Sequence, residues 1–357
     1  MRVGILTSGG DCQGLNGAMY GLVKALNFNC KEKLEIYGIL EGYTGLINSN
    51  YKKMKSEEFE GILNMGGSIL GNSRQPFKRI NDADENGVTK VQSMIKNYKN
   101  MDLDCLVVLG GNGSHKTANL LSEQGLNVVT LPKTIDNDIN GTEMTLGFQS
   151  AIDIATRTLE ELHTTAKSHK RIIIDEIMGN KAGFLTLYSG IAGEADIILI
   201  PEIPYSIDKI VDFINKKLDE GRRHIIIAAA EGIISKDESK LTKKELKQKR
   251  AAENYTSAAV YLEKKLSEKI NREIRAVVPG HIQRGGSPCA YDKVLTSRLG
   301  AKGAELILNK EYGKMVAVVN NEISSVPLSV AVEKPKRVNP NDEIVKQARM
   351  MGICLGD

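Results

Sequence analysis

Two carboxylates separated by a single residue stand in the segment PKTIDND, at residues 132–138. The segment places Lys133 and Thr134 just before Asp136 and Asp138. One carboxylate of such a pair can take the proton of an attacking hydroxyl while the other holds Mg²⁺, which is the chemistry of metal-assisted phosphoryl transfer. Taken alone, the segment also suits an Asp/Asn turn whose side chains bond their own backbone.

Two glycine-rich segments follow apolar runs: SGGDCQGLN at residues 8–16 and GGNGS at residues 110–114. Glycine lets the backbone approach an anion closely, and the N-terminus of a following helix supplies free N–H groups. Neither segment has the spacing of a dinucleotide fingerprint or of a P-loop. Because turns of this kind meet at the carboxyl edge of a parallel sheet, the pair predicts a phosphate-binding site.

A fourth segment, GHIQRGGSP at residues 280–288, carries a histidine and an arginine three positions apart. His281 and Arg284 can hold one phosphate dianion from two sides through charge-assisted hydrogen bonds.

The elements that must position these residues alternate in type. Short apolar runs at residues 3–6, 106–109, 128–131, 171–177, 224–229 and 275–278 are separated by longer amphipathic stretches. Continuous apolar runs are typical of parallel strands buried on both faces, so the pattern predicts an α/β protein with mostly parallel sheets.

The composition is that of an ordinary globular protein, and 357 residues suggest about two domains. Basic residues number 48 against 44 acidic ones, a net charge of +4 that is too small for a nucleic-acid partner. No apolar run is long enough to span a membrane, and the N-terminus lacks a signal-peptide layout. Five scattered cysteines predict free thiols in a reducing cytoplasm, hence a cytoplasmic protein.

One stretch, residues 235–253, is dense in lysine and poor in large apolar residues. We expect a solvated helical insertion on the surface, and a basic docking patch is the alternative.

Read together, these segments resemble the phosphofructokinase family. The four segments occur in family order across almost the whole chain, with LGNSR at residues 70–74, SHKR at 168–171, MG at 178–179 and AE at 230–231 between them. The resemblance implies two doubly wound, three-layer α/β domains with the active site in the cleft between them. The phosphoryl-donor (nucleotide) domain would be residues 1–147 plus 284–335, and the sugar-phosphate domain residues 148–283 plus 336–357.

The resemblance also implies roles for individual residues. Asp136 matches the base that takes the proton of the sugar 1-hydroxyl, Thr134 helps hold the transferring group, and Lys133 adds a cation near the departing phosphates. Asp138 and Asn112 match the positions that support Mg²⁺. The positions matching the donor site are Gly10, Arg74, Gly111, Asn112, Gly113 and Ser114. The positions matching the sugar-phosphate site are Met178, Gly179, Glu231, His281 and Arg284, together with Arg171 and Arg275, which the family contributes across a subunit interface.

The reaction implied is phosphoryl transfer to fructose 6-phosphate, giving fructose 1,6-bisphosphate in glycolysis, in a homotetramer or homodimer. Glycine at position 113 leaves room for a nucleotide, whereas the family has aspartate there in pyrophosphate enzymes, so we expect ATP as the donor. Lys133 is compatible with either donor, and pyrophosphate stays the alternative.

Three features depart from the family pattern. Asn112 replaces an aspartate that supports the metal, and Asn180 replaces an arginine that contacts the transferring group, a role that Lys181 or Lys133 would take over in part. Several cations of the bacterial effector site are also missing, since this chain has Tyr20, Lys24, His163, Glu220 and Arg222 there. We therefore expect weak or absent control by nucleotides and phosphoenolpyruvate.

These departures leave other functions open. A sugar-phosphate-binding regulatory paralogue with little catalysis is one, although it would have no need of Asp136. Within the kinase interpretation, a seven-carbon ketose phosphate also stays open as the substrate, because the motifs define the phosphate contacts better than the length of the sugar. A dehydrogenase is disfavoured by the glycine spacing.

Overall fold

The computed structural model describes residues 1–357, which fall into two compact units. Unit 1 comprises Met1–Ser150 and Arg284–Lys336, and unit 2 comprises Ala151–Gln283 and Arg337–Asp357. The boundaries expected from the sequence lie close to these. The first segment of the donor domain was expected to end at residue 147 and ends at 150, and the second was expected to end at 335 and ends at 336.

Unit 1 is built on one seven-stranded sheet. Its strands are β1 (Arg2–Ser8), β2 (Glu35–Ile39), β3 (Tyr51–Met54), β4 (Cys105–Gly110), β5 (Val128–Pro132), β10 (Lys314–Val319) and β11 (Glu322–Pro327). In the order β11-β10-β5-β4-β1-β2-β3, the five inner strands run parallel, and the two edge strands are antiparallel to their neighbours. All residues of β4 and β5 are buried, as expected for strands covered on both faces.

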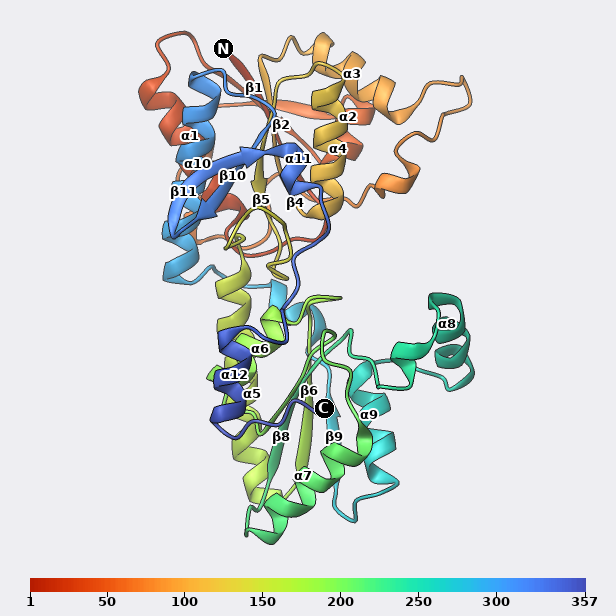
Figure 1. Ribbon diagram of the computed structural model, residues 1–357. Helices are drawn as coiled ribbons and strands as arrows, with labels where there is room; N and C mark the ends of the chain where they lie inside the picture. Colours follow the sequence, from red (N-terminus) through yellow and green to blue (C-terminus); the bar gives the residue numbers. More distant parts are fainter. The chain divides into compact units, whose positions relative to one another are not determined.

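Helices cover both faces of this sheet (Figure 1). They are α1 (Leu15–Asn29), α2 (Tyr43–Asn48), α3 (Lys90–Asn100), α4 (Asn112–Glu123), α10 (Ala290–Leu308) and α11 (Leu328–Ala331). Helices α1 and α10 lie side by side on one face, and the other four lie on the opposite face. The α1–α10 contact requires glycine, because a Cβ on Gly21 would stand 2.2 Å from Ser297 O and one on Gly300 would stand 2.2 Å from Ala18 O.

Unit 2 contains a smaller, fully parallel sheet in the order β7-β8-β6-β9, formed by β6 (Ile172–Ile177), β7 (Ile197–Leu199), β8 (Ile225–Ala230) and β9 (Ile274–Val277). Its helices are α5 (Phe148–His169), which begins at the last residues of unit 1, α6 (Phe184–Ala192), α7 (Ile207–Asp219), α8 (Lys243–Ala252), α9 (Ala258–Ser267) and α12 (Glu343–Met350). Helices α7 and α9 pack on one face of the sheet, and α5 and α6 lie on the other (Figure 1).

Both units are therefore three-layer α/β structures with mostly parallel sheets, which confirms the expected fold class. All five cysteines are free thiols, as predicted. None of the helices combines the length and the apolar character that crossing a bilayer requires. The insertion at residues 235–253 contains α8, which buries none of its residues, so the expectation of a solvated surface helix is confirmed.

Candidate active site

Three cations of unit 1 converge on the turn that follows β1. A Cβ built on Gly10 would stand 3.2 Å from Arg284 Nη1 and 3.5 Å from Arg74 Nη2. Lys133 Nζ donates to Gly10 O, and Arg284 Nη1 donates to Asp11 O at 3.1 Å. The absence of a side chain at Gly10 thus leaves space between guanidinium groups where an anion can be held.

Lys133 is a buried cation at the end of β5, with an exposed fraction of 3%. Its backbone N–H donates to Gly110 O at 2.9 Å, which ties the end of β5 to the end of β4. Burial is the main cause that lowers the pKa of Lys133, and the charge of Arg284 lowers it further. A bound phosphate would favour the charged form of this amine.

The second glycine turn opens α4, which begins at Asn112 directly after Gly111. No atom lies within 4 Å of a Cβ built on Gly113, so this position faces open space. The Ser114 side chain is buried, and its Oγ would lie 3.9 Å from a Cβ on Gly9. The two turns are therefore neighbours, as the strand order predicts.

The loop after β5 is held in a fixed shape by its own polar groups. Asp136 N donates to Thr134 Oγ1 at 3.1 Å. Asn137 has a left-handed φ of 50°, donates to Glu143 O at 3.0 Å, and accepts from Thr145 N at 3.0 Å. The turn-forming side-chain bonds considered from the sequence are thus made by Thr134 and Asn137.

Asp138 lies beside Asn112, whose Nδ2 donates to Asp138 Oδ2 at 2.7 Å. Burial, and secondly the charge of Asp136, raise the pKa of Asp138 to about 6. A carboxylate whose charge is disfavoured by burial and by a second carboxylate beside it fits a divalent cation. No group of three or more His, Cys, Asp or Glu side chains forms a metal cluster, and Mg²⁺ does not need one, because it binds through one or two carboxylates, waters and substrate phosphates.

Sequence reasoning did not single out Lys336. Its backbone N–H donates to Asp138 O at 2.8 Å, and its Nζ donates to Thr142 O at 2.9 Å. The ammonium therefore lies near the carboxylate loop. No local motif marks it, because it comes from the distant end of unit 1 in the sequence.

In unit 2, Glu231 orients the loop that follows β6. Its Oε1 accepts hydrogen bonds from Asn180 N at 2.7 Å and Gly179 N at 3.3 Å. Met178 N donates to Oε1 of the buried Gln283 at 3.0 Å. The conformation of the Met178–Gly179 segment is thus set by two side chains from other parts of the unit.

Arg171 and Arg275 share one carboxylate. Arg171 Nε donates to Glu273 Oε2 at 2.7 Å, and Arg275 Nη2 donates to Glu273 Oε1 at 2.6 Å. The pKa of Glu273 is lowered chiefly by its hydrogen bond to Arg171. His281 is exposed in the same unit. Arg284, which the resemblance assigns to the sugar-phosphate site, lies against Gly10 and Asp11 in unit 1.

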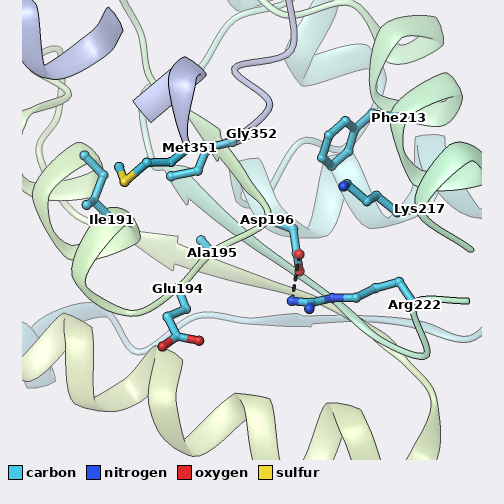
Figure 2. Close-up of a pocket in the computed structure, with 10 residues that line it drawn as sticks. Ile191, Glu194, Ala195, Asp196, Phe213, Lys217, Arg222, Met351 and Gly352 are labelled. Carbon is cyan, nitrogen blue, oxygen red and sulfur yellow. Dashed lines mark ion pairs between the residues drawn. The ribbon is translucent and has the colours of Figure 1, made fainter. Parts of the chain in front are cut away.

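The unit 2 residues at the expected effector positions, His163, Glu220 and Arg222, each contact another side chain of unit 2. Arg222 Nη2 pairs with Asp196 Oδ1 at 2.9 Å beside a cavity of about 370 Å³, which Figure 2 shows. Glu220 pairs with Lys217 at 3.2 Å, and His163 Nδ1 lies 3.2 Å from His224 Nε2. The expected insensitivity to nucleotide effectors stays a prediction.

Comparison with known proteins decides the family. A sequence model of the family described as phosphofructokinase matches residues 2–307. The chain belongs to the phosphofructokinase family. It is 47% identical over 357 residues to the ATP-dependent 6-phosphofructokinase of Spirochaeta thermophila, covering 99% of this chain and 97% of that protein. It is 42% identical to ATP-dependent 6-phosphofructokinase 3 of Bacteroides thetaiotaomicron, covering 100% of both.

Solved structures of other phosphofructokinases share the fold. The Saccharomyces cerevisiae phosphofructokinase superposes with a TM-score of 0.76 at 28% identity, and this chain spans 45% of that longer chain. The pyrophosphate-dependent phosphofructokinase of Marinobacter aquaeolei superposes with a TM-score of 0.81 at 18% identity over 100% of this chain and 92% of that one, which is a likeness of fold alone. The resemblance inferred from the motifs is confirmed.

Proposed function

We propose that this chain is an ATP-dependent 6-phosphofructokinase, which transfers the terminal phosphoryl group of ATP to the 1-hydroxyl of fructose 6-phosphate in glycolysis. The observation that carries the proposal is the convergence of Arg74, Lys133 and Arg284 on Gly10. It occurs in a chain that aligns over its full length with proteins named for this activity.

The chemistry needs a base and a means of holding charge. Asp136 accepts the proton of the sugar 1-hydroxyl while the hydroxyl oxygen attacks the γ-phosphorus of ATP. The bond between the γ-phosphorus and the β–γ bridging oxygen breaks, and ADP leaves. Thr134 fixes the backbone of Asp136 through the bond to its N–H. Lys133 and the two arginines stabilise the negative charge on the transferring and departing phosphates.

Mg²⁺ fits beside this loop. Asp138 would hold it directly or through water, with Asn112 offering an amide oxygen, and the ion would neutralise phosphate charge. The raised pKa of Asp138 means that its carboxylate is poorly compensated by the protein alone.

The sugar phosphate is assigned to residues of unit 2. Met178, Gly179, Glu231 and His281 bind the sugar phosphate together with Arg171 and Arg275, which reach the site of a neighbouring subunit. A homotetramer or homodimer in the cytoplasm is therefore part of the proposal. The Glu231 bonds that fix the Met178–Gly179 loop support a shaped sugar site.

The assignment of ATP as the donor rests on Gly113. No atom of the protein lies within 4 Å of a Cβ built there, which leaves room for a nucleotide. The name shared by the full-length relatives also supports ATP.

Asp136→Asn tests the assignment of the base. The variant should retain binding of fructose 6-phosphate and lose turnover by about 10³-fold or more, since general base catalysis typically contributes about 10²–10⁴. A wild type that binds the sugar phosphate without turning it over would favour a regulatory paralogue instead.

A further inference from the structure

The insertion at residues 235–253 forms one wall of a second cavity in unit 2. This cavity has a volume of about 640 Å³, which lies in the range of small-molecule sites. Helix α8 contributes Lys243 and Lys247, and Lys181 lines the cavity from the segment after Gly179.

The lining of this cavity is cationic and contains no carboxylate. Arg250 is compensated by Glu238, with Nε 2.9 Å from Oε1. The three lysines form no ion pair or side-chain hydrogen bond. Glu245, the acid of the first turn of α8, is occupied by the N–H and Oγ1 of Thr242 at 2.8 and 2.7 Å. Three positive charges therefore face the cavity without partners, which favours a multiply charged anion.

Part of the lining of the same cavity is apolar. Leu246 and Ala251 of α8 line it beside the ring of Tyr255. The guanidinium carbon of Arg250 lies 4.2 Å from the centroid of that ring. The ring of Tyr261 also packs against Tyr255, with the two centroids 5.2 Å apart. Tyr255 therefore adds to the apolar lining beside Leu246 and Ala251, and an apolar lining next to cations suits a heterocyclic base that carries phosphates. A simple inorganic anion would leave this surface unused.

Helix α8 is held in place although none of its residues is buried. Glu238 has an exposed fraction of 1%, and Arg250 Nη2 also donates to Ile233 O at 2.9 Å. Removing either partner of a buried ion pair is costly, so this anchor fixes the end of α8 that carries Arg250. The cavity wall is thus positioned before any ligand arrives.

We propose that this cavity is a second nucleotide site, which binds a nucleoside polyphosphate. The phosphates lie on Lys181, Lys243 and Lys247, and the base lies against Leu246, Ala251 and Tyr255. The donor-site positions Gly10, Arg74, Gly111, Asn112, Gly113 and Ser114 belong to unit 1 and do not line this cavity. Lys181 is the one lining residue that was also considered for phosphoryl transfer, so the test below leaves it unchanged.

The test counts ADP bound to the full-length protein by equilibrium dialysis without sugar phosphate. Lys243→Ala/Lys247→Ala should bind one equivalent fewer than wild type, or bind it at least about tenfold more weakly. The control Lys244→Ala/Lys264→Ala removes the same charge from exposed positions outside the cavity and should bind as wild type does. Unchanged binding in the first variant, or an equal loss in both, would overturn the proposal.

Inorganic pyrophosphate serves as a second probe. It should displace ADP from the cavity at least about tenfold less effectively than ATP does, because it lacks the base. Equal displacement would refute the nucleoside part of the proposal. Because binding is measured without turnover, neither result depends on the proposed kinase activity.

Discussion

The side-chain amide of Asn112 donates to Asp138 Oδ2 at 2.7 Å, so an uncharged group lies beside the carboxylate that we propose to bind Mg²⁺. This amide supports Asp138, whose pKa is already raised to about 6 by burial and by Asp136. A substitution at Asn112 therefore tests how the carboxylate of Asp138 is stabilised.

Asn112→Asp should remove the hydrogen bond and set two carboxylates against each other. In EDTA we expect the unfolding temperature of the variant to lie about 4 °C below that of wild type. Adding Mg²⁺ should raise the unfolding temperature of the variant by more than it raises that of wild type. Asn119 makes the same kind of contact on the surface, donating to Glu123 Oε1 at 2.7 Å. Asn119→Asp is thus the control and should show no Mg²⁺ dependence. Equal effects at both positions would contradict a metal-binding Asp138.

Lys133 should be required for turnover. Lys133→Met keeps the length of the buried side chain but removes its charge, and kcat should fall by about 10²-fold, the loss typical of one preorganised donor. Lys181→Ala, measured in the same assay, shows whether the lysine after Asn180 supplies part of the missing arginine's charge. If neither variant changed kcat, the idea that a lysine compensates for Asn180 would be abandoned.

Gly113 should determine whether ATP can enter. Because a side chain there meets open space and lies in the first turn of α4, Gly113→Asp should fold normally. Its KM for ATP should rise by about tenfold or more, since the carboxylate repels phosphate and occupies nucleotide space. Gly113→Ala, which adds volume without charge, should keep a KM near that of wild type. A Gly113→Asp variant with an unchanged KM for ATP would remove the structural basis of the donor assignment.

Asp175 should make unit 2 less stable as the pH rises. It is fully buried on β6, neither carboxylate oxygen has a hydrogen-bond partner, and burial followed by the charge of Glu176 raises its pKa to about 8. Because the pKa of Asp175 is higher in the folded than in the unfolded protein, the free energy of unfolding is greatest at low pH. It falls as the pH rises from about 4, the pKa of an unfolded aspartate, to about 8.

Asp175→Asn abolishes this titration. Its advantage over wild type in unfolding free energy should grow across that window by up to about 1.4 kcal/mol per pH unit, as followed by urea denaturation at several pH values. A difference that does not change with pH would show that Asp175 is ionised in the folded protein.

The sequence was most informative where structure is local. The turns at Gly10 and Gly113 follow buried strands as expected, because apolar runs and glycine spacing act over a few residues. The pairing of Glu273 with both Arg171 and Arg275, and the contact of Lys336 with Asp138, depend on residues brought together by folding. The contacts of Arg284 with Gly10 and Asp11 also depend on folding, although the boundary expected at residue 284 already placed this arginine in the donor domain.

The most direct test of the proposed function is one steady-state assay with fructose 6-phosphate and Mg²⁺, run side by side with ATP and with pyrophosphate, that measures formation of fructose 1,6-bisphosphate. We predict turnover with ATP at a kcat/KM at least about tenfold above that with pyrophosphate. Turnover with pyrophosphate alone, or with neither donor, would contradict the account.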